Sequence, residues 1–275
     1  SDDLYTRTLR ARLPFALAGG VGIGLWLWAL LPFARGSPGS GWRFSAAFLL
    51  LVALSVSLLL HLREVRYYAL LVALGGAIFF VHLRYAVLHA ISFPRWAVAL
   101  VALLFLLFHT FFQAAFSFAV LLGAERGWAA WRGRTGWRDL APFAAAAALA
   151  APFVAWFELL ETAAAFSEGF DFGFRDYLHN LGVVGEHLLR HEFLVAALAA
   201  RAAAVLLNAG GREGRAVAAG LLLFSTGYVA LGCLNPLPLE RYFVVLSPAI
   251  TGAFLLDAFA LAGLLPQRRA AATAA

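Results

Sequence analysis

The sequence has little of what a water-soluble enzyme normally carries. Only 13% of its 275 residues are charged, it contains no lysine and no methionine, and Cys233 is its single cysteine. A soluble domain carries about a quarter charged residues, so this composition excludes the soluble enzyme classes. One cysteine also excludes an intramolecular disulfide and a thiolate metal cluster. Because Ser1 is not an initiator methionine, we expect an upstream portion of the protein.

Apolar residues dominate what is present, at 63% of the chain with a mean hydropathy of +0.83. A membrane-spanning helix needs about 20 predominantly apolar residues. The sequence therefore predicts an all-α, polytopic membrane bundle of about eight or nine transmembrane helices in a single transmembrane domain, residues 1–275. The apolar runs are 14–34, 44–62, 67–84, 96–124, 141–158, 193–209, 216–233 and 242–265.

The run 96–124 is too long for one upright crossing. Its 29 residues would make roughly 44 Å of helix, against a hydrocarbon core of about 30 Å. A tight hairpin whose tip lies at His109, Thr110 and Gln113 is one interpretation, and a single tilted helix with a buried polar patch is the other. The hairpin gives nine crossings and the tilted helix gives eight.

The charged residues are 21 arginines against 15 acids, a net charge of +6. Arginine gathers in the cytoplasmic joints of membrane proteins, so the excess indicates topology and not a nucleic-acid partner. Both crossing models place Arg126, Arg132, Arg134 and Arg138 in the cytoplasm and the loop 159–192 outside. We expect a bacterial inner membrane location with a cytoplasmic C-terminus.

The exterior loop contains a predicted amphipathic helix that lies on the membrane interface. From Arg175 onward, apolar residues recur at helical spacing, at Tyr177, Leu181, Val184, Leu188 and Leu189. His187 and His191 stand four residues apart and are candidate ligands for a divalent metal. A solvent-exposed polar face explains the same residues without a metal.

Four motifs follow one another along the chain and carry a resemblance when they are taken together. They are R-L-P-F-A-L-A-G-G at 12–20, H-L-R-E-V-R-Y-Y-A-L at 61–70, L-F-H-T-F-F at 107–112 and E-R-Y-F-V-V-L-S-P at 240–248. In this order and with this hydrophobic spacing, residues 10–265 resemble the transmembrane region of GT-C glycosyltransferases. These enzymes use a polyprenyl-phosphate sugar donor and include the protein O-mannosyltransferases and the lipid A aminoarabinose transferase.

The resemblance implies a site at the outer membrane boundary. It places Arg63, Arg66 and Arg241 there, where guanidinium groups bind the lipid phosphate of the donor bidentately and stabilise the departing phosphate. An ordinary interfacial role, with arginines that anchor the helices next to tyrosines, is the alternative.

The resemblance also implies a loop near the substrate with His109 at a helical tip, together with Tyr67 and Tyr242. The catalytic base of the family is an Asp or Glu well upstream of the R-L-P stretch. Here Asp2 and Asp3 are the acids that precede that stretch, and only eight residues separate Asp3 from Arg12. They are weak candidates because the loop and helices that normally follow the acid are missing. The chain therefore lacks a clear catalytic acid.

Ionisable residues inside apolar runs need a partner or a purpose. Asp257 and Arg201 are predicted to join structural ion pairs between helices, with a substrate contact as the alternative. His61, His82 and His89 are candidate ligands of haem or chlorophyll, although no surrounding pattern demands a cofactor.

Two functions are consistent with these observations. One is a membrane glycosyltransferase, or the remnant of one, that transfers a sugar from a polyprenyl phosphate on the outer face. The other is a non-catalytic accessory subunit that packs through small residues at 143–151, 196–204 and 216–220 against a larger photosynthetic or respiratory membrane complex. A transporter is disfavoured because no segment repeats.

Overall fold

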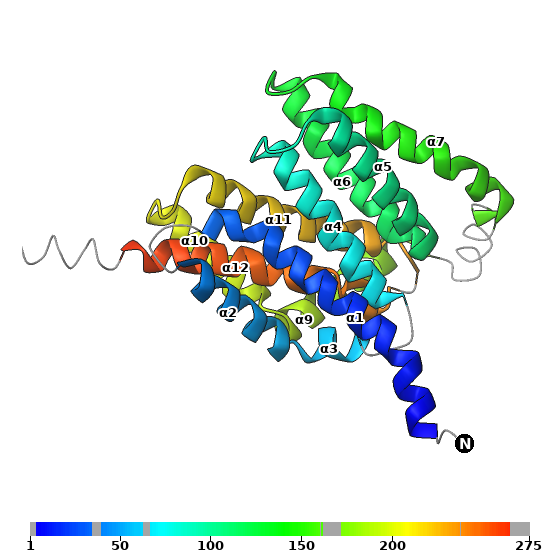
Figure 1. Ribbon diagram of the computed structural model, residues 1–275, viewed down its shortest axis with the longest axis horizontal. Helices are drawn as coiled ribbons and strands as arrows, with labels where there is room; N and C mark the ends of the chain where they lie inside the picture. The colour runs from blue at the N-terminus through cyan, green and yellow to red at the C-terminus, as the bar shows by residue number, and fades with distance from the viewer. Residues whose placement is uncertain are drawn as a thin grey trace, which may run out of the picture.

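The computed structural model describes residues 4–34, 40–62, 67–159, 161, 172–236 and 238–264. This part of the chain is helical throughout, with eleven α-helices, three 3₁₀ helices and no strand (Figure 1). The predicted all-α class is therefore correct.

The first half of the chain forms six α-helices and one 3₁₀ helix. They are α1 (Leu4–Leu30), η1 (Leu31–Ala34), α2 (Ser40–Leu54), α3 (Val56–Leu62), α4 (Tyr68–Ala86), α5 (Phe93–Thr110) and α6 (Phe112–Trp131). The predicted run 44–62 is interrupted at Ser55, whose side-chain oxygen accepts a hydrogen bond from the Leu58 amide at 3.3 Å. A serine that binds backbone in this way competes with the helical ladder.

The second half forms five α-helices and two 3₁₀ helices. They are η2 (Trp137–Leu140), α7 (Ala141–Trp156), α9 (Phe174–His191), α10 (Leu194–Leu206), α11 (Arg212–Gly232), η3 (Glu240–Phe243) and α12 (Leu246–Ala262). The predicted amphipathic helix is α9. Its N-terminus is capped by Asp176, which accepts a hydrogen bond from the Gly173 amide at 2.9 Å.

The long run 96–124 is a hairpin and not one tilted helix. Phe111 separates α5 from α6 and has extended dihedral angles, φ −159° and ψ 97°. The two helices lie side by side in Figure 1. The break comes where the sequence places His109 and Thr110, and the Thr110 hydroxyl bonds the Leu106 carbonyl at 2.8 Å.

Helix directions follow from pairs of contacting residues. Trp26 of α1 contacts Phe79 of α4 with ring centroids 4.7 Å apart, and Trp28 contacts Phe80 at 4.9 Å, so α1 and α4 are parallel. The helix α11 runs antiparallel to α6, because Gln113 at the start of α6 bonds Gly232 at the end of α11.

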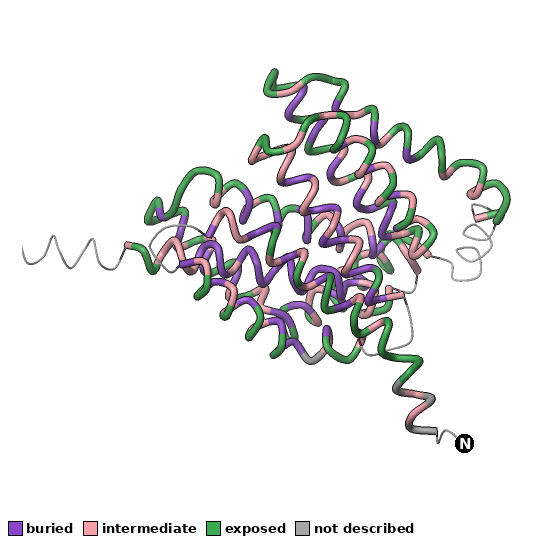
Figure 2. The backbone as a smooth tube through the Cα atoms, in the orientation of Figure 1, coloured by how far each residue is buried: buried purple, intermediate pink, exposed green. Residues whose placement is uncertain are grey.

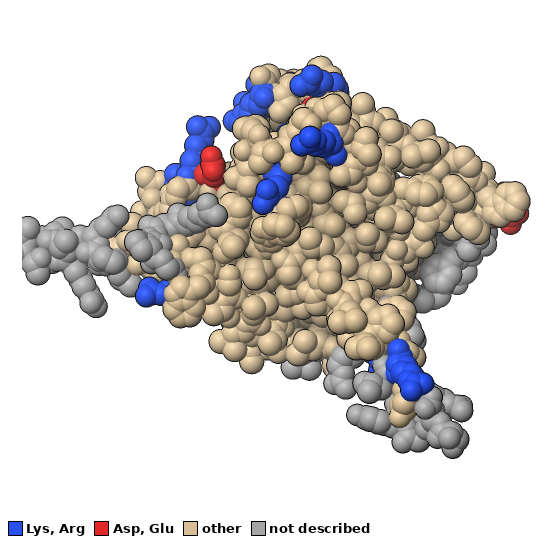
Figure 3. All heavy atoms as spheres, viewed as in Figure 1, with Lys and Arg blue, Asp and Glu red and all other residues tan. Residues whose placement is uncertain are grey.

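The bundle therefore has two distinct ends. At the arginine end, α4 and α6 finish and α11 begins, with Arg84, Arg126, Arg132 and Arg212. At the tyrosine end, α4 begins and α11 finishes, with Tyr67, Tyr68, Tyr228 and Tyr242. Figure 3 shows basic side chains gathered at the upper left, toward the arginine end, and an almost uncharged surface between the ends.

The helix α12 forms the centre of the bundle. Every residue from Leu246 to Ala253 is buried, and α12 packs against α10, α11, α2 and α1. A helix that is apolar all round is expected in such a position. Figure 2 shows buried backbone concentrated in the interior and exposed backbone along the outer helices, α7 among them.

Five helical segments of the described chain are long and apolar enough to cross a membrane: Arg10–Ala34, Tyr68–Ala86, Phe93–Thr110, Trp137–Trp156 and Arg212–Gly232. Ser40–Leu54, Leu194–Leu206 and Leu246–Ala262 are apolar but shorter. These helices are those of an integral membrane protein. The larger number of crossings, the kind of membrane and the side that holds the C-terminus remain predictions.

The contact between α1 and α4 depends on two glycines. A Cβ atom at Gly22 would lie 2.7 Å from the backbone N and Cα of Ala73, and one at Gly76 would lie 2.9 Å from the Gly22 carbonyl oxygen. Real Cβ atoms do not approach backbone so closely. The absence of both side chains therefore sets the spacing of this helix pair.

We expect Gly22→Ala to lower the free energy of unfolding by about 1–3 kcal/mol, because the added methyl group forces two backbones apart. Gly24→Ala is the matched control on the same helix, since nothing lies within 4 Å of a Cβ atom there. Unfolding in detergent, followed by tryptophan fluorescence, measures both. Equal stability of the two variants would contradict the close contact.

Candidate functional site

A row of three aromatic rings crosses the tyrosine end. Tyr67 at the N-terminus of α4 stacks on Phe111, the residue between α5 and α6, with centroids 5.1 Å apart. Phe111 in turn contacts Tyr242 of η3 at 5.0 Å. Tyr67 and Tyr242, which the sequence analysis assigned to a substrate loop, thus both contact Phe111 at the hairpin tip.

Arg241 lies beside this row. Burial is the largest cause that raises the pKa of the Tyr67 phenol, and the Arg241 guanidinium opposes that rise. The Arg241 Nε is buried and makes no hydrogen bond to any described residue. A buried guanidinium donor without an acceptor is costly, so this N–H group is available to an oxygen that the described protein does not supply.

Amide groups hold the segment that leads to η3. The Gln113 side chain donates to the Gly232 carbonyl at 3.2 Å, and Asn235 donates to the Gln113 side-chain oxygen at 3.4 Å. Asn180 of α9 donates to the Asn235 carbonyl at 3.1 Å. These bonds join α6, α9 and the end of α11, and the Tyr228 hydroxyl of α11 donates to the Tyr242 carbonyl at 3.3 Å.

A buried carboxylate lies deeper at the same end. Glu192, which directly follows α9, is 8% exposed. The Ser55 hydroxyl donates to its Oε1 at 3.4 Å, and the Ser247 hydroxyl lies 3.2 Å from that of Ser55. Burial raises the pKa of Glu192, and the hydrogen bonds from Ser247 and Ser55 oppose the rise. The sequence analysis assigned no buried role to Glu192.

Several predicted site residues lie outside the described part of the chain or away from the row. Arg63, Arg66, Asp2 and Asp3 are outside the described residues. The exposed His109 points away from Tyr67 and Tyr242. Its ring packs against Phe105, Phe108 and Phe153 of α5 and α7, with centroids 4.6, 5.3 and 4.7 Å away.

The predicted histidine pair is formed, since the rings of His187 and His191 are 5.0 Å apart on α9. The described residues contain no group of three or more His, Cys, Asp or Glu side chains that would hold a metal ion. Two imidazoles alone leave a metal ion short of protein ligands.

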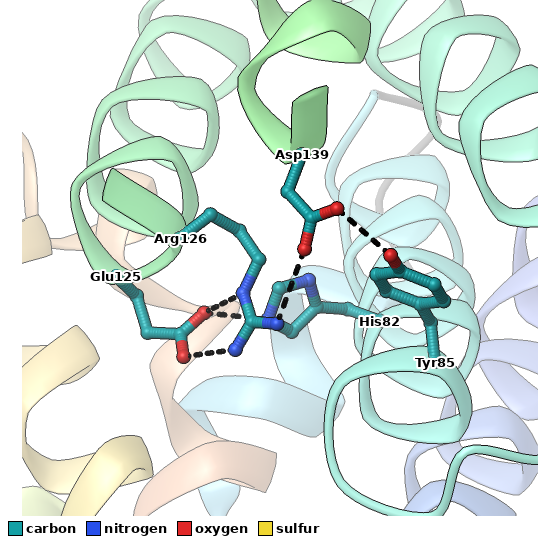
Figure 4. Close-up of polar contacts among 5 residues, drawn as sticks. All are labelled: His82, Tyr85, Glu125, Arg126 and Asp139. Carbon is teal, nitrogen blue, oxygen red and sulfur yellow. Dashed lines mark hydrogen bonds and ion pairs between the residues drawn. The ribbon is translucent and has the colours of Figure 1, made fainter. Parts of the chain in front are cut away.

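A second polar cluster lies at the arginine end (Figure 4). Arg126 of α6 pairs with Glu125 through Nη2 and through Nε at 2.6 Å, and its Nη1 is 3.8 Å from Asp139 of η2. Two α4 residues complete it: His82 Nε2 lies 3.2 Å from Glu125, and the Tyr85 hydroxyl donates to Asp139 at 2.8 Å.

The cluster joins three elements and is buried on one side only: Arg126 is 5% exposed and Asp139 is 1% exposed, whereas the Glu125 side chain is 48% exposed. Trp96 covers it by stacking on Tyr85 at 4.2 Å. Buried ion pairs require such partners on every side. The interactions account for His82 as a partner of Glu125, whereas the sequence analysis considered it a cofactor ligand.

Sequence reasoning missed this cluster because it placed Arg126 in a cytoplasmic joint from charge alone. The adjacent acid and base at 125–126, directly after an apolar run, were the available signal. The sequence around Asp139 contained no such signal, because its partners Tyr85 and Arg126 belong to other helices. The predicted ion pair of the other intramembrane residues is confirmed, with Arg201 Nη1 at 3.2 Å from Asp257 Oδ1.

The remaining histidines lie apart from one another. His61 contacts the ring of Tyr68 at 5.3 Å, and His89 is exposed in a turn with a φ of 50°.

Comparison with known proteins adds no relative. The chain matches no protein-family model, no curated protein and no solved structure.

We expect Arg126→Leu to lower the free energy of unfolding by about 3–5 kcal/mol, because it leaves the buried Asp139 carboxylate without its cation. Tyr85→Phe removes one hydrogen bond to Asp139 and should lower it by about 1–2 kcal/mol. Arg132→Leu is the matched control directly after α6, since Arg132 is exposed and its guanidinium contacts only the rings of Trp128 and Trp131 among the described residues. Unfolding in detergent ranks the three variants. A similar loss of unfolding free energy in Arg132→Leu would show that the contacts within the cluster do not stabilise the protein.

The raised pKa of the Glu192 carboxyl makes the free energy of unfolding depend on pH. Its pKa is raised in the folded protein, so its contribution is complete below the ordinary glutamate pKa and is lost as the pH rises through the raised value. Glu192→Gln keeps an oxygen for Ser55 and removes the titration. We expect the variant to lose this part of the slope and to be at least as stable as the parent at neutral pH. Unfolding midpoints from acidic to neutral pH test this, and parallel profiles would refute it.

Proposed function

We propose that the tyrosine end binds the phosphate of a polyprenyl-phosphate sugar and that the chain transfers this sugar, as the GT-C enzymes it resembles do. The observation that carries the proposal is Arg241, whose buried Nε has no acceptor among the described residues. It stands beside Tyr67 and Tyr242 at the end of the bundle.

A phosphate ester suits this position chemically. Guanidinium groups bind phosphate oxygens in a fixed fork and remain charged at any relevant pH. Tyr67 and Tyr242 add phenol groups next to the same cation. Arg63 precedes Tyr67 by four residues and Arg66 by one, so the proposal includes both as further phosphate ligands.

A lipid carrier suits the apolar surroundings of Arg241. Phe112 follows the hairpin tip and is 48% exposed, and Leu239 precedes Arg241 by two residues and is 40% exposed. Exposed apolar side chains at the end of a membrane bundle face acyl chains. A polyprenyl tail can lie along this surface while its phosphate reaches Arg241.

The reaction follows from the charge that the donor develops. When the acceptor hydroxyl attacks the sugar, the bond from the anomeric carbon to the lipid phosphate breaks and negative charge grows on the departing phosphate. Arg241 stabilises that charge more strongly than it stabilises the bound donor, which is the condition for catalysis. A carboxylate must accept the acceptor proton, and Asp2 and Asp3 are the residues that the resemblance offers.

A non-catalytic subunit is the second candidate, and α7 favours it. This helix lies at the edge of the bundle in Figure 1, where it packs on α5. Its outward surface consists largely of alanines, including Ala144, Ala145, Ala147, Ala148 and Ala151. Small residues permit close approach of another membrane helix.

Sugar transfer in membrane vesicles tests the first candidate. We expect Arg241→Ala to lower the rate by about 10²–10³-fold, the usual loss when a group that stabilises developing charge is removed. Arg190→Ala is the matched control, because Arg190 is an exposed arginine on α9, paired with Glu186, and lies outside the aromatic row. Insertion of each variant into the membrane is measured in parallel.

Binding of the polyprenyl phosphate itself separates the two candidates. Binding that depends on Arg241 without any transfer by the parent protein would favour a scaffold that has lost its chemistry. Unchanged binding and transfer in Arg241→Ala would overturn the phosphate assignment, and stable co-purification with a membrane complex would then favour the subunit.

A further inference from the structure

A cavity of about 720 Å³ opens at the arginine end, far along α12 from the aromatic row. Residues from α2, the start of α11 and the end of α12 line it, among them Arg43, Arg215, Asp257 and Phe259. Its volume lies within the range of ligand pockets, about 300–1,000 Å³. The proposed transfer reaction makes no use of this cavity, because Arg241 belongs to the opposite end.

The cavity contains an acceptor without a donor. Asp257 is 1% exposed, and its Oδ1 lies 3.2 Å from Arg201 Nη1. Its Oδ2 is buried and makes no hydrogen bond to any described residue. A carboxylate oxygen left unpaired in the interior is costly, so this atom points to a ligand that donates a hydrogen bond.

The remaining charge in the cavity is positive. Arg201 neutralises Asp257 and is itself held in place, because it donates to the Arg215 carbonyl at 2.9 Å. Arg215 also donates to the Asn208 side chain. Arg43 is exposed at the rim and has no described hydrogen bond or ion pair. Arg43 and Arg215 therefore leave a net positive site, which favours an anionic group.

Two glycines in the turn between α10 and α11 form one wall of the cavity without adding side chains to it. Gly210 has a φ of 79°, and a Cβ atom there would lie 2.7 Å from the Ala260 Cβ. Gly211, its neighbour in the lining, has nothing within 4 Å of its Cβ position. The turn between α10 and α11 thus passes close to α12 without filling the space in front of Asp257.

From these observations we infer that the cavity binds a phosphate ester that carries a free hydroxyl, of the glycerol-phosphate class. The phosphate lies between Arg43 and Arg215, and the hydroxyl donates to Asp257 Oδ2. A headgroup with an ammonium group would also donate to Asp257, but it would be neutral overall and leave both arginines unmatched. Phe33, Leu256 and Phe259 give the cavity an apolar wall, which suits the glycerol phosphate of a membrane lipid.

Lipid retention tests the inference on the whole chain. The protein is reconstituted in phosphatidylcholine vesicles that contain phosphatidylglycerol, extracted into detergent, and examined by native mass spectrometry. We expect the parent to retain phosphatidylglycerol, and Arg43→Gln and Arg215→Gln each to weaken binding about tenfold, the loss expected for one charge-assisted hydrogen bond. Arg134→Gln is the matched control, because Arg134 is an exposed arginine at the same end outside the lining.

Two further binding measurements identify the ligand. Phosphatidylmethanol has the same charge but no headgroup hydroxyl, and we expect it to bind more weakly than phosphatidylglycerol. Competition by soluble glycerol 3-phosphate at comparable concentrations would assign the site to a soluble ester of the same chemistry, whereas its failure to compete assigns the site to the lipid.

Three results would overturn the inference. They are equal retention of phosphatidylcholine, binding in Arg43→Gln and Arg215→Gln that matches the parent, and equal binding of phosphatidylmethanol. None of these results bears on Arg241, so the outcome is independent of the proposed sugar transfer.

Discussion

The close contact between α1 and α4 determines the layout of the whole bundle. Gly22 brings the backbone of α1 against that of Ala73, and the two helices run in the same direction. The chain between them must therefore return across the bundle through α2 and α3. This return brings the joints after α1 and after α4 to one end, together with the start of α11 and the end of α12. Both the arginine end and the tyrosine end exist because this pair is parallel.

Polar groups in this protein are concentrated where helices end, and those that lie deeper are paired across helices. Arg126 joins Glu125 and Asp139 at the arginine end, and Arg201 joins Asp257 between α10 and α12. The buried carboxylates, Asp139 and Asp257, would destabilise an apolar interior if their cations were removed. These pairs therefore hold the flanking hairpin and the central helix in register. Arg241 Nε and Asp257 Oδ2 are among the buried polar atoms that make no hydrogen bond within the described chain, and the two proposed binding sites depend on them.

The two proposed sites use one chemistry in different ways. At the tyrosine end, a guanidinium beside phenol groups faces an apolar border, which suits a phosphate that leaves during a reaction. At the arginine end, two guanidiniums and a carboxylate oxygen surround a cavity, which suits a phosphate that stays bound and strengthens the packing of α2, α11 and α12. Separation of the sites by the length of the bundle allows each to be tested without disturbing the other.

The helical class, the membrane environment and nearly all of the helices follow from the hydrophobic pattern, because a lipid phase requires long apolar segments that satisfy their own backbone hydrogen bonds. The polar interruption of the run 96–124 was visible in the sequence. The choice between a hairpin and one tilted helix was decided by the extended Phe111 and the packing of α5 on α6. Tertiary structure alone placed His109 among phenylalanines of α5 and α7, Glu192 between two serines, and Asp139 within reach of Arg126. These partners come from different helices or joints, up to 137 residues apart for Ser55 and Glu192, and the hydrophobic pattern records only which residues avoid water. It does not record which helices become neighbours, because many arrangements of apolar helices bury similar surface in lipid.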